Sequence, residues 1–275
     1  MNTQPAAQKV KITVIMVDGS FRPHFALIDL LKSQTLAAED YEVLWIEYYD
    51  EIKQELIDKM HGQRNFRAIT LKKSGTYHSS YCFNRGITEA RGEVLVIPDA
   101  DVLVEADFLE TAWGEHRAHD QLAMYVFRMD EPKRESSLCL DLNYLKRVCV
   151  LTNPQNYGGC LTIRKKWLMK VNGYEQHDMF GGGAHANGRD VYTRLKNMGM
   201  YVKWHPQLRL YHPWHPHPQR FQDGYVLQNV LIDHRAACLD MLPYNGIDPA
   251  FDRDLPQSLQ VKLDAERSRI LSRRP

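Results

Sequence analysis

The sequence predicts an α/β protein with a mostly parallel central sheet flanked by helices. Residues 10–17 (VKITVIMV) form a continuous β-branched and apolar run, typical of a strand that is covered on both faces. A second such run, residues 93–97 (EVLVI), follows a helical pattern that Gly92 ends. Strand and helix patterns alternate through this half of the chain, which is the order that βαβ units require.

The other elements follow in chain order. Further strands are expected at residues 42–48, 67–71, 122–129 and 201–211, and helices at residues 23–34, 81–91, 105–119, 164–171, 190–198 and 221–242. Segment 130–156 mixes charge, proline and short apolar runs, so we expect a loop excursion there. We expect residues 1–9 to be a disordered tail, residues 10–218 to be one domain and residues 219–275 to be a helical C-terminal extension.

The composition argues against several classes of protein. Lys plus Arg (35) nearly balance Asp plus Glu (34), so the basic excess of a nucleic-acid binder is missing. The five cysteines are scattered without a CxxC pair, which favours a reducing compartment and a cytoplasmic location. No run approaches the roughly 18 apolar residues of a transmembrane segment, although peripheral membrane association stays open. No GxxxxGK[ST] loop or GxGxxG motif supports a kinase or a dehydrogenase.

Two carboxylates, Asp99 and Asp101, directly follow the strand at residues 93–97. In open parallel sheets, ligands bind beyond the carboxyl ends of the strands. Two carboxylates separated by one residue can there hold a divalent cation, Mn²⁺ or Mg²⁺, together with substrate phosphates. An ordinary polar turn has the same pattern, so the surrounding sequence has to decide between the two interpretations.

The segment NRGITEARGEVLVIPDAD, residues 84–101, resembles the part of family-two glycosyltransferases that leads into their DxD motif. Phe21-Arg22-Pro23 is similar to the family's Asn-Arg-Pro-like turn, with Phe at the usual Asn position. Residues 158–165 (GGCLTIRK) and 171–174 (VNGY) look like the acceptor-side block of these enzymes and of related galactosyltransferases.

The resemblance covers about residues 10–215 and implies a GT-A fold, with a donor half at about 10–129 and an acceptor half at about 157–218. It implies a hexosyltransferase that moves a sugar from a nucleotide-diphosphate donor, most commonly a UDP-sugar, to a hydroxyl of a glycan or other small acceptor. Inversion is the usual outcome in this family.

The resemblance also implies donor-binding residues. In the family, residues just after the first strand and an acidic residue that ends the second strand hold the base and the ribose. They correspond to Val17, Asp18 and Glu47. Asp99 would contact the ribose or the donor sugar, and Asp101 would hold the cation.

A histidine-rich segment, residues 211–218 (YHPWHPHP), lies late in the predicted domain. Histidines at this density indicate metal coordination or a rigid surface turn. The resemblance implies that a late histidine completes the cation site, with His212 as the first candidate and His215 as the second. Trp214 is an expected platform for an acceptor sugar, and the backbone at Gly159 is expected to approach the acceptor closely.

The predicted general base is where the chain departs from the family. Alignment on Arg194-Leu195 puts Asp190 at the last acidic position but Asn187 and Gly188 where the Glu-Asp pair stands. In inverting relatives, a carboxylate of that pair deprotonates the acceptor hydroxyl, which an asparagine cannot do. His185 and Asp190 are the expected replacements, with Asp178 third, since a histidine titrates near neutral pH.

Two alternatives remain open at this stage. A metal-dependent hydrolase could use the histidine cluster and the two carboxylates, and it would act without a nucleotide. A non-catalytic protein on the same fold could bind a nucleotide sugar and transfer nothing, as the change at Asn187 and Gly188 suggests.

Overall fold

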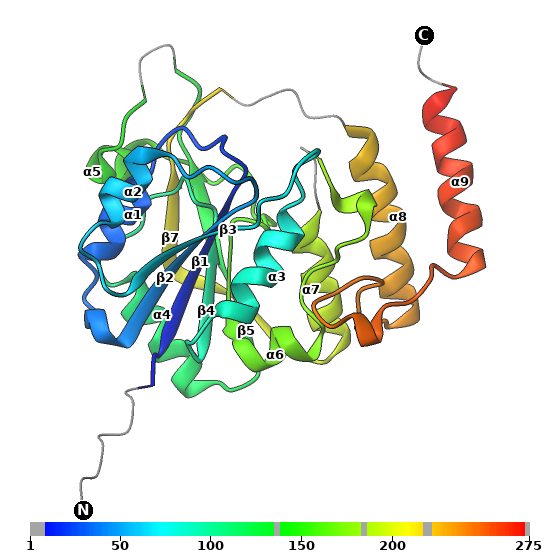
Figure 1. The fold of residues 1–275 in the computed structure, drawn as a ribbon, viewed down its shortest axis with the longest axis horizontal. Coiled ribbons are helices and arrows are strands. Elements are labelled where there is room, and N and C mark those ends of the chain that lie inside the picture. Colours follow the sequence, from blue (N-terminus) through cyan, green and yellow to red (C-terminus); the bar gives the residue numbers. More distant parts are fainter. Residues whose placement is uncertain (1–8, 135–137, 183–185, 217–221, 273–275) are drawn as a thin grey trace, which may run out of the picture.

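A seven-stranded sheet forms the centre of the molecule, in the order β3-β2-β1-β4-β6-β5-β7 (Figure 1). The computed structural model describes residues 9–134, 138–182, 186–216 and 222–272. The strands are β1 Ile12–Asp18, β2 Tyr41–Glu47, β3 Phe66–Thr70, β4 Val94–Pro98, β5 Leu122–Asp130, β6 Cys160–Arg164 and β7 Tyr201–His212. The helices are α1 Ala26–Lys32, α2 Gln54–Met60, α3 Ser79–Glu89, α4 Phe108–Ala118, α5 Leu142–Val148, α6 Lys165–Lys170, α7 Asn187–Asn197, α8 Gln222–Cys238 and α9 Gln257–Leu271, with 3₁₀ turns η1 Ala38–Asp40, η2 Asp178–Phe180 and η3 Pro249–Phe251.

The strand pairing confirms the predicted mostly parallel α/β class. Four of the six pairings are parallel, and β6 runs antiparallel to both of its neighbours. The carboxyl ends of the other strands therefore lie at one edge of the sheet, and the first residue of β6, Cys160, pairs there with Pro98. We call this edge the carboxyl edge.

Both faces of the sheet are covered, which explains the continuous apolar runs. All seven residues of β1 are buried, and the same holds for β2. Successive β1 side chains alternate between two core clusters: Val14 and Met16 pack in the core with α1, α2 and α4, while Ile15 and Val17 pack in the core with α3, α6 and α7 (Figure 1).

The segment 130–156, expected to be a loop excursion, contains helix α5 and returns to the sheet. Asp141 caps this short helix, because its carboxylate accepts hydrogen bonds from the backbone N–H groups of Asn143 and Tyr144. Leu145 is buried in a small core cluster, and Asp130 pairs with Val150 through an isolated bridge. One buried leucine on a helix of seven residues leaves too weak a periodic pattern for sequence reasoning to detect.

The short strands expected around residues 201–211 form a single strand, β7, of 12 residues. His205-Pro206 interrupts the strand pattern in the sequence, but a proline fits here because β7 is an edge strand. The register between β5 and β7 shifts between Tyr125 and Phe127, so an irregularity accommodates the change.

Helices α8 and α9 confirm the predicted helical C-terminal extension (Figure 1). Leu259 and Leu263 of α9 share a core cluster with Leu231 and Ile232 of α8. Within the described ranges, no helix has both the length and the apolar character needed to cross a membrane. Residues 1–8 of the predicted disordered tail lie outside the described residues.

A buried ionic network joins α8 to α7. Arg235 is fully buried, and its guanidinium pairs with Asp190 of α7 and with Glu175. Arg194 Nε and Nη2 both lie 2.9 Å from Asp190 Oδ2. Burial by itself would raise the pKa of Asp190, but the two arginines outweigh it and hold the pKa below its usual range.

Replacing Arg235 with methionine is expected to lower the free energy of unfolding by about 3–5 kcal/mol. The change leaves Glu175 without its arginine and Asp190 with only one of two, and breaking a buried ion pair strands an uncompensated charge. Urea denaturation followed by circular dichroism measures the change. Arg269→Met on α9 is the matched control, because Arg269 is exposed and pairs with Glu266 on the same helix, and the change should alter stability by less than about 0.5 kcal/mol. Equal stability of the two variants would contradict this account.

Candidate metal centre

Three possible metal ligands converge at the carboxyl edge: Asp101, His212 and His215. Their ligand atoms all lie within 4.8 Å of one another. His212 Nε2 lies 3.8 Å from Asp101 Oδ1, and His215 Nε2 lies 3.4 Å from Asp101 Oδ2. The structure thus brings together the three residues that the sequence nominated as metal ligands from two distant segments.

Backbone pairing produces this convergence. Leu103, two residues after Asp101, exchanges hydrogen bonds with Tyr211, with N···O distances of 2.7 and 2.9 Å. This antiparallel bridge joins the segment after β4 to the end of β7, where His212 is the last residue of the strand. Because the bridge consists of backbone bonds, it sets the separation of the two ligand segments independently of their side chains.

The three residues fit a divalent cation. Asp101 is 4% exposed, and its Oδ1 is buried and receives no hydrogen bond from any residue that the structure describes. His212 Nδ1 lies 3.3 Å from Asp130 Oδ1, so the carboxylate orients the ring with Nε2 toward Asp101, a common support for metal-binding histidines. One carboxylate and two imidazoles suit a transition cation such as Mn²⁺ better than Mg²⁺, which prefers oxygen ligands.

Arg22 is a residue of this site to which sequence reasoning assigned no role. It lies in the turn after β1, and its guanidinium hydrogen-bonds to Asp101 Oδ2. Burial would raise the pKa of Asp101, but Arg22, helped by His215 and His212, holds it well below its usual range. Burial would likewise lower the pKa of Arg22, yet Asp101 and Asp99 raise it. Asp101 is therefore a carboxylate beside a permanent cation. The Phe21-Arg22-Pro23 turn was the signal that pointed to this position.

Arg128 of β5 is the second cation that the sequence did not reveal. Its Nη1 donates to Asp99 Oδ2 at 2.8 Å, and its Nε lies 2.9 Å from Asp130 Oδ1. The backbone N–H of Asp99 donates to the carbonyl of Gly159 at 2.8 Å, which joins the DxD segment to the start of β6. An arginine near the end of an otherwise apolar strand was the available signal, since such a charge requires a partner.

Asp18 and Glu47 are neighbours in the β1–β2 register at the carboxyl edge. Asp18 holds the turn after β1 by accepting hydrogen bonds from the N–H groups of Gly19 and Phe21, at 2.9 and 3.2 Å. Glu47 accepts from Ser20 Oγ at 3.2 Å. Burial raises the pKa of both carboxyls. The Val17 side chain packs in the core, so only its backbone can face a ligand.

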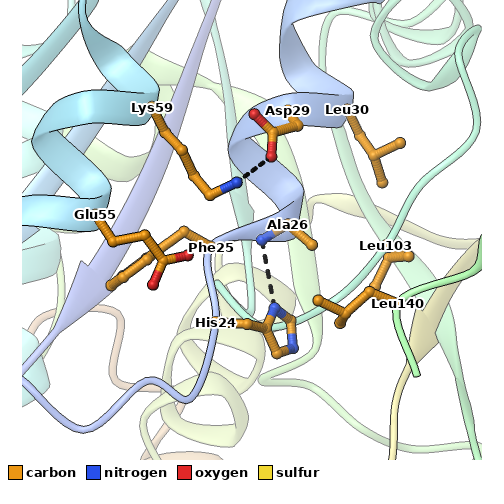
Figure 2. A pocket seen from close by; sticks show the side chains of 9 residues that line it. All are labelled: His24, Phe25, Ala26, Asp29, Leu30, Glu55, Lys59, Leu103 and Leu140. Atoms are coloured by element: carbon orange, nitrogen blue, oxygen red, sulfur yellow. Dashed lines mark hydrogen bonds and ion pairs between the residues drawn. The ribbon is translucent and has the colours of Figure 1, made fainter. Parts of the chain in front are cut away.

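A small cavity of about 240 Å³ lies beside this turn (Figure 2). Its lining residues are His24, Phe25, Ala26, Asp29, Leu30, Glu55, Lys59, Leu103 and Leu140. Burial lowers the pKa of His24 to about 4, so this imidazole is neutral at physiological pH. Ligand pockets usually exceed about 300 Å³, which makes this cavity too small for a sugar nucleotide.

Of the three predicted general bases, the structure shows one, Asp190, to be engaged by arginines. Asp190 is fully buried, and both of its carboxylate oxygens are paired with arginines, so neither is available to an acceptor hydroxyl in this conformation. His185 lies outside the described residues. Asp178 is exposed in η2. The side chain of Asn187 donates to Ser79 Oγ at 2.7 Å.

The structure gives a steric reason for a glycine at position 188. A Cβ atom at this position would lie 2.4 Å from the carbonyl oxygen of Tyr157, far closer than side chains approach backbone. The loop before β6 therefore occupies the space that an acidic side chain would need. Trp214, the predicted acceptor platform, is partly buried, and its backbone N–H donates to Glu131 Oε2 at 2.8 Å.

Comparisons with known proteins show the fold. Neither a protein-family model nor a curated protein matches the chain. S. aureus TarS is 13% identical with a TM-score of 0.61, covering 94% of this chain and 42% of that one. TarS 1–349 in complex with UDP is 12% identical with a TM-score of 0.61, covering 94% and 70%. The mannosyltransferase PcManGT from Pyrobaculum calidifontis, in complex with GDP-Man and Mn²⁺, is 15% identical with a TM-score of 0.56, covering 93% and 68%. The chain thus spans less than half of TarS, and it shares its fold with a glycosyltransferase.

Replacing Asp130 with alanine is expected to weaken Mn²⁺ binding by about 10- to 100-fold, because His212 loses the carboxylate that orients its ring. Titration of Mn²⁺ followed by electron paramagnetic resonance measures the affinity. Asp107→Ala is the control, since Asp107 is exposed at the start of α4 and should leave binding unchanged. Wild-type affinity in the folded Asp130→Ala protein would contradict the orienting role.

Proposed function

We propose that the protein is a metal-dependent glycosyltransferase of the family-two type. It transfers a hexose from a nucleotide-diphosphate donor, first of all a UDP-sugar, to a hydroxyl of a glycan or other small acceptor. The observation that carries this proposal is the convergence of Asp101, His212 and His215 beside Arg22 at the carboxyl edge. The shared fold with a mannosyltransferase whose structure contains GDP-Man and Mn²⁺ supports it, as does the DxD segment at residues 84–101.

Asp101, His212 and His215 would hold the cation, Mn²⁺ or Mg²⁺. When bound, it supplies Lewis-acid stabilisation of the negative charge on the diphosphate leaving group. Arg22 keeps Asp101 ionised and adds a fixed positive charge beside it, which favours the binding of phosphate groups. A role in phosphate binding would explain why an arginine is buried in the turn after β1.

Donor contacts complete this half of the proposed site. Arg128 holds the Asp99 carboxylate in one orientation, where it would accept hydrogen bonds from hydroxyls of the ribose or the donor sugar. Val17 through its backbone, together with Asp18 and Glu47, would surround the base and ribose, as the family resemblance implies. Asp18 shapes the turn that carries Arg22, so its role in binding is partly indirect.

Acceptor contacts are proposed on the other half of the domain. Gly159 is a candidate because its carbonyl accepts a hydrogen bond from the backbone of Asp99. Trp214 is a candidate because it lies between the two proposed histidine ligands in the chain.

We also propose the division of the chain into a donor half at about residues 10–129, an acceptor half at about 157–218 and a C-terminal extension at 219–275. The cytoplasmic location stays a prediction.

Inversion at the anomeric carbon is included in the proposal, with His185 as the first candidate for the base and Asp178 as the second. Asp190 is not proposed as the base, because its two oxygens are engaged by arginines. The anomeric configuration of the product, determined by NMR, tests this point. A product that retains the configuration of the donor would remove the need for a base and refute inversion.

Replacing Asp101 with asparagine is expected to weaken Mn²⁺-dependent nucleotide binding by at least about 10-fold, because the site loses the only carboxylate among its three ligands. Calorimetric titration of UDP, GDP and their sugar conjugates, with Mn²⁺ and then with EDTA, measures the effect. Asp107→Asn is the matched control, since it removes an exposed carboxylate six residues further along the chain.

Other outcomes of this titration separate the rival functions. If no nucleotide bound under either condition, the transferase proposal would fail and a metal-dependent hydrolase would become the better explanation. If a nucleotide sugar bound but no acceptor received the sugar, the protein would be a non-catalytic binder. The engaged carboxylate of Asp190 and the glycine at position 188 are the observations that favour this second candidate.

A further inference from the structure

A second and larger cavity, of about 690 Å³, lies between the loop before β6 and helices α7 and α8. None of the residues of the metal centre lines it. Its volume falls within the range of roughly 300–1,000 Å³ that is usual for ligand pockets. We call it the tyrosine groove, after Tyr157, Tyr192 and Tyr225, which all line it.

Two of these tyrosines pack against each other and against a third, buried ring. The rings of Tyr157 and Tyr192 lie 4.3 Å apart between centroids, at an angle of 30°. Tyr125, which is fully buried, contacts both rings with centroid distances of 5.9 and 6.0 Å. These contacts hold the two rings in place, so a ligand that binds against their exposed parts does not have to order them first, which favours binding. Tyr225 of α8 is 44% exposed and adds a third aromatic face.

Amide side chains supply the polar part of the lining, among them Asn153, Gln155 and Asn229. An amide both donates and accepts hydrogen bonds, as a sugar hydroxyl does. Two cations line the groove, Arg189 and Lys196. Arg189 is already paired, since its guanidinium hydrogen-bonds to Asn229 and lies 2.8 Å from Asp233, which leaves one lysine. Aromatic faces combined with amides match a ligand with apolar ring faces and many hydroxyls. A phosphate-rich ligand would instead call for several cations without partners.

The groove is connected to the metal centre through the loop before β6. At one end of this loop, Gly159 accepts the hydrogen bond from the backbone of Asp99. Tyr157, two residues earlier, lines the groove and packs its carbonyl against Gly188 at the start of α7. From Arg189 to Asn197, α7 lines the groove over about 12 Å, since an α-helix rises about 1.5 Å per residue.

We propose that the tyrosine groove binds an oligosaccharide, namely the part of the acceptor chain that lies away from the sugar receiving the transfer. The inference that the bound chain is the acceptor rests on the proposed function. The inference that the groove binds carbohydrate rests on the residues that line it. The groove gives the protein a way to select long acceptors over monosaccharides, because sugars beyond the reacting one contribute to binding.

The test is binding of defined oligosaccharides, measured by calorimetry and by saturation-transfer NMR. The panel contains chains of two to eight hexose, N-acetylhexosamine or uronate units. Tyr225→Ala and Asn229→Ala should each weaken binding by about 5- to 10-fold, the usual cost of removing a tyrosine or a central polar contact. Tyr201→Ala is the matched control, because Tyr201 is 55% exposed at the start of β7 and is not among the residues that line the groove. Nucleotide affinity in the presence of Mn²⁺ is measured on the same samples and should stay unchanged.

The outcomes separate this inference from the proposed function. Binding of no oligosaccharide at millimolar concentration, or wild-type affinity in both groove variants, would overturn the groove proposal even if nucleotides bind. Oligosaccharide binding that is lost in the groove variants, in a protein that binds no nucleotide, would uphold the groove and overturn the transferase. Loss of binding in Tyr201→Ala to the same extent would also overturn the assignment to the groove.

Discussion

Two buried carboxylates, Asp101 and Asp190, are held by opposing cations, and both the candidate metal centre and the attachment of α8 to α7 depend on these pairings. Asp101 faces Arg22, and Asp190 lies between Arg194 and Arg235. The reason is energetic, because an ionised group removed from water costs several kcal/mol unless a partner of opposite charge compensates it.

The two carboxylates differ in how many of their oxygens are engaged, and this difference separates a candidate metal ligand from a structural acid. Asp190 has both oxygens engaged, so it fastens α7 to α8 and has none to offer a ligand. Asp101 has one oxygen engaged by Arg22, while its Oδ1 receives no hydrogen bond within the described part of the chain and faces His212. A buried carboxylate oxygen that accepts no hydrogen bond is available as a ligand for a cation.

The reversed direction of β6 explains how the two halves of the domain meet. Because β6 is antiparallel to β4, its first residue lies at the carboxyl edge and pairs with the last residue of β4. The loop before β6 then reaches Asp99 through Gly159 and the tyrosine groove through Tyr157. Its close contact with Gly188 excludes an acidic side chain at the start of α7. One loop therefore explains why position 188 is a glycine and borders the groove.

The sequence by itself determined the α/β class and the order of the main strands along the chain, and it nominated Asp101, His212 and His215 as candidate metal ligands. These features are local in the sequence. A strand that is covered on both faces has a continuous apolar run, and the carboxylates at its end follow it directly in the chain. Only the tertiary structure decided that Arg22 and Arg128 are the partners of Asp101 and Asp99, and that Asp190 is occupied. The physical reason is that these pairs join residues 79, 29 and 45 positions apart, and such proximity depends on how the strands and helices pack.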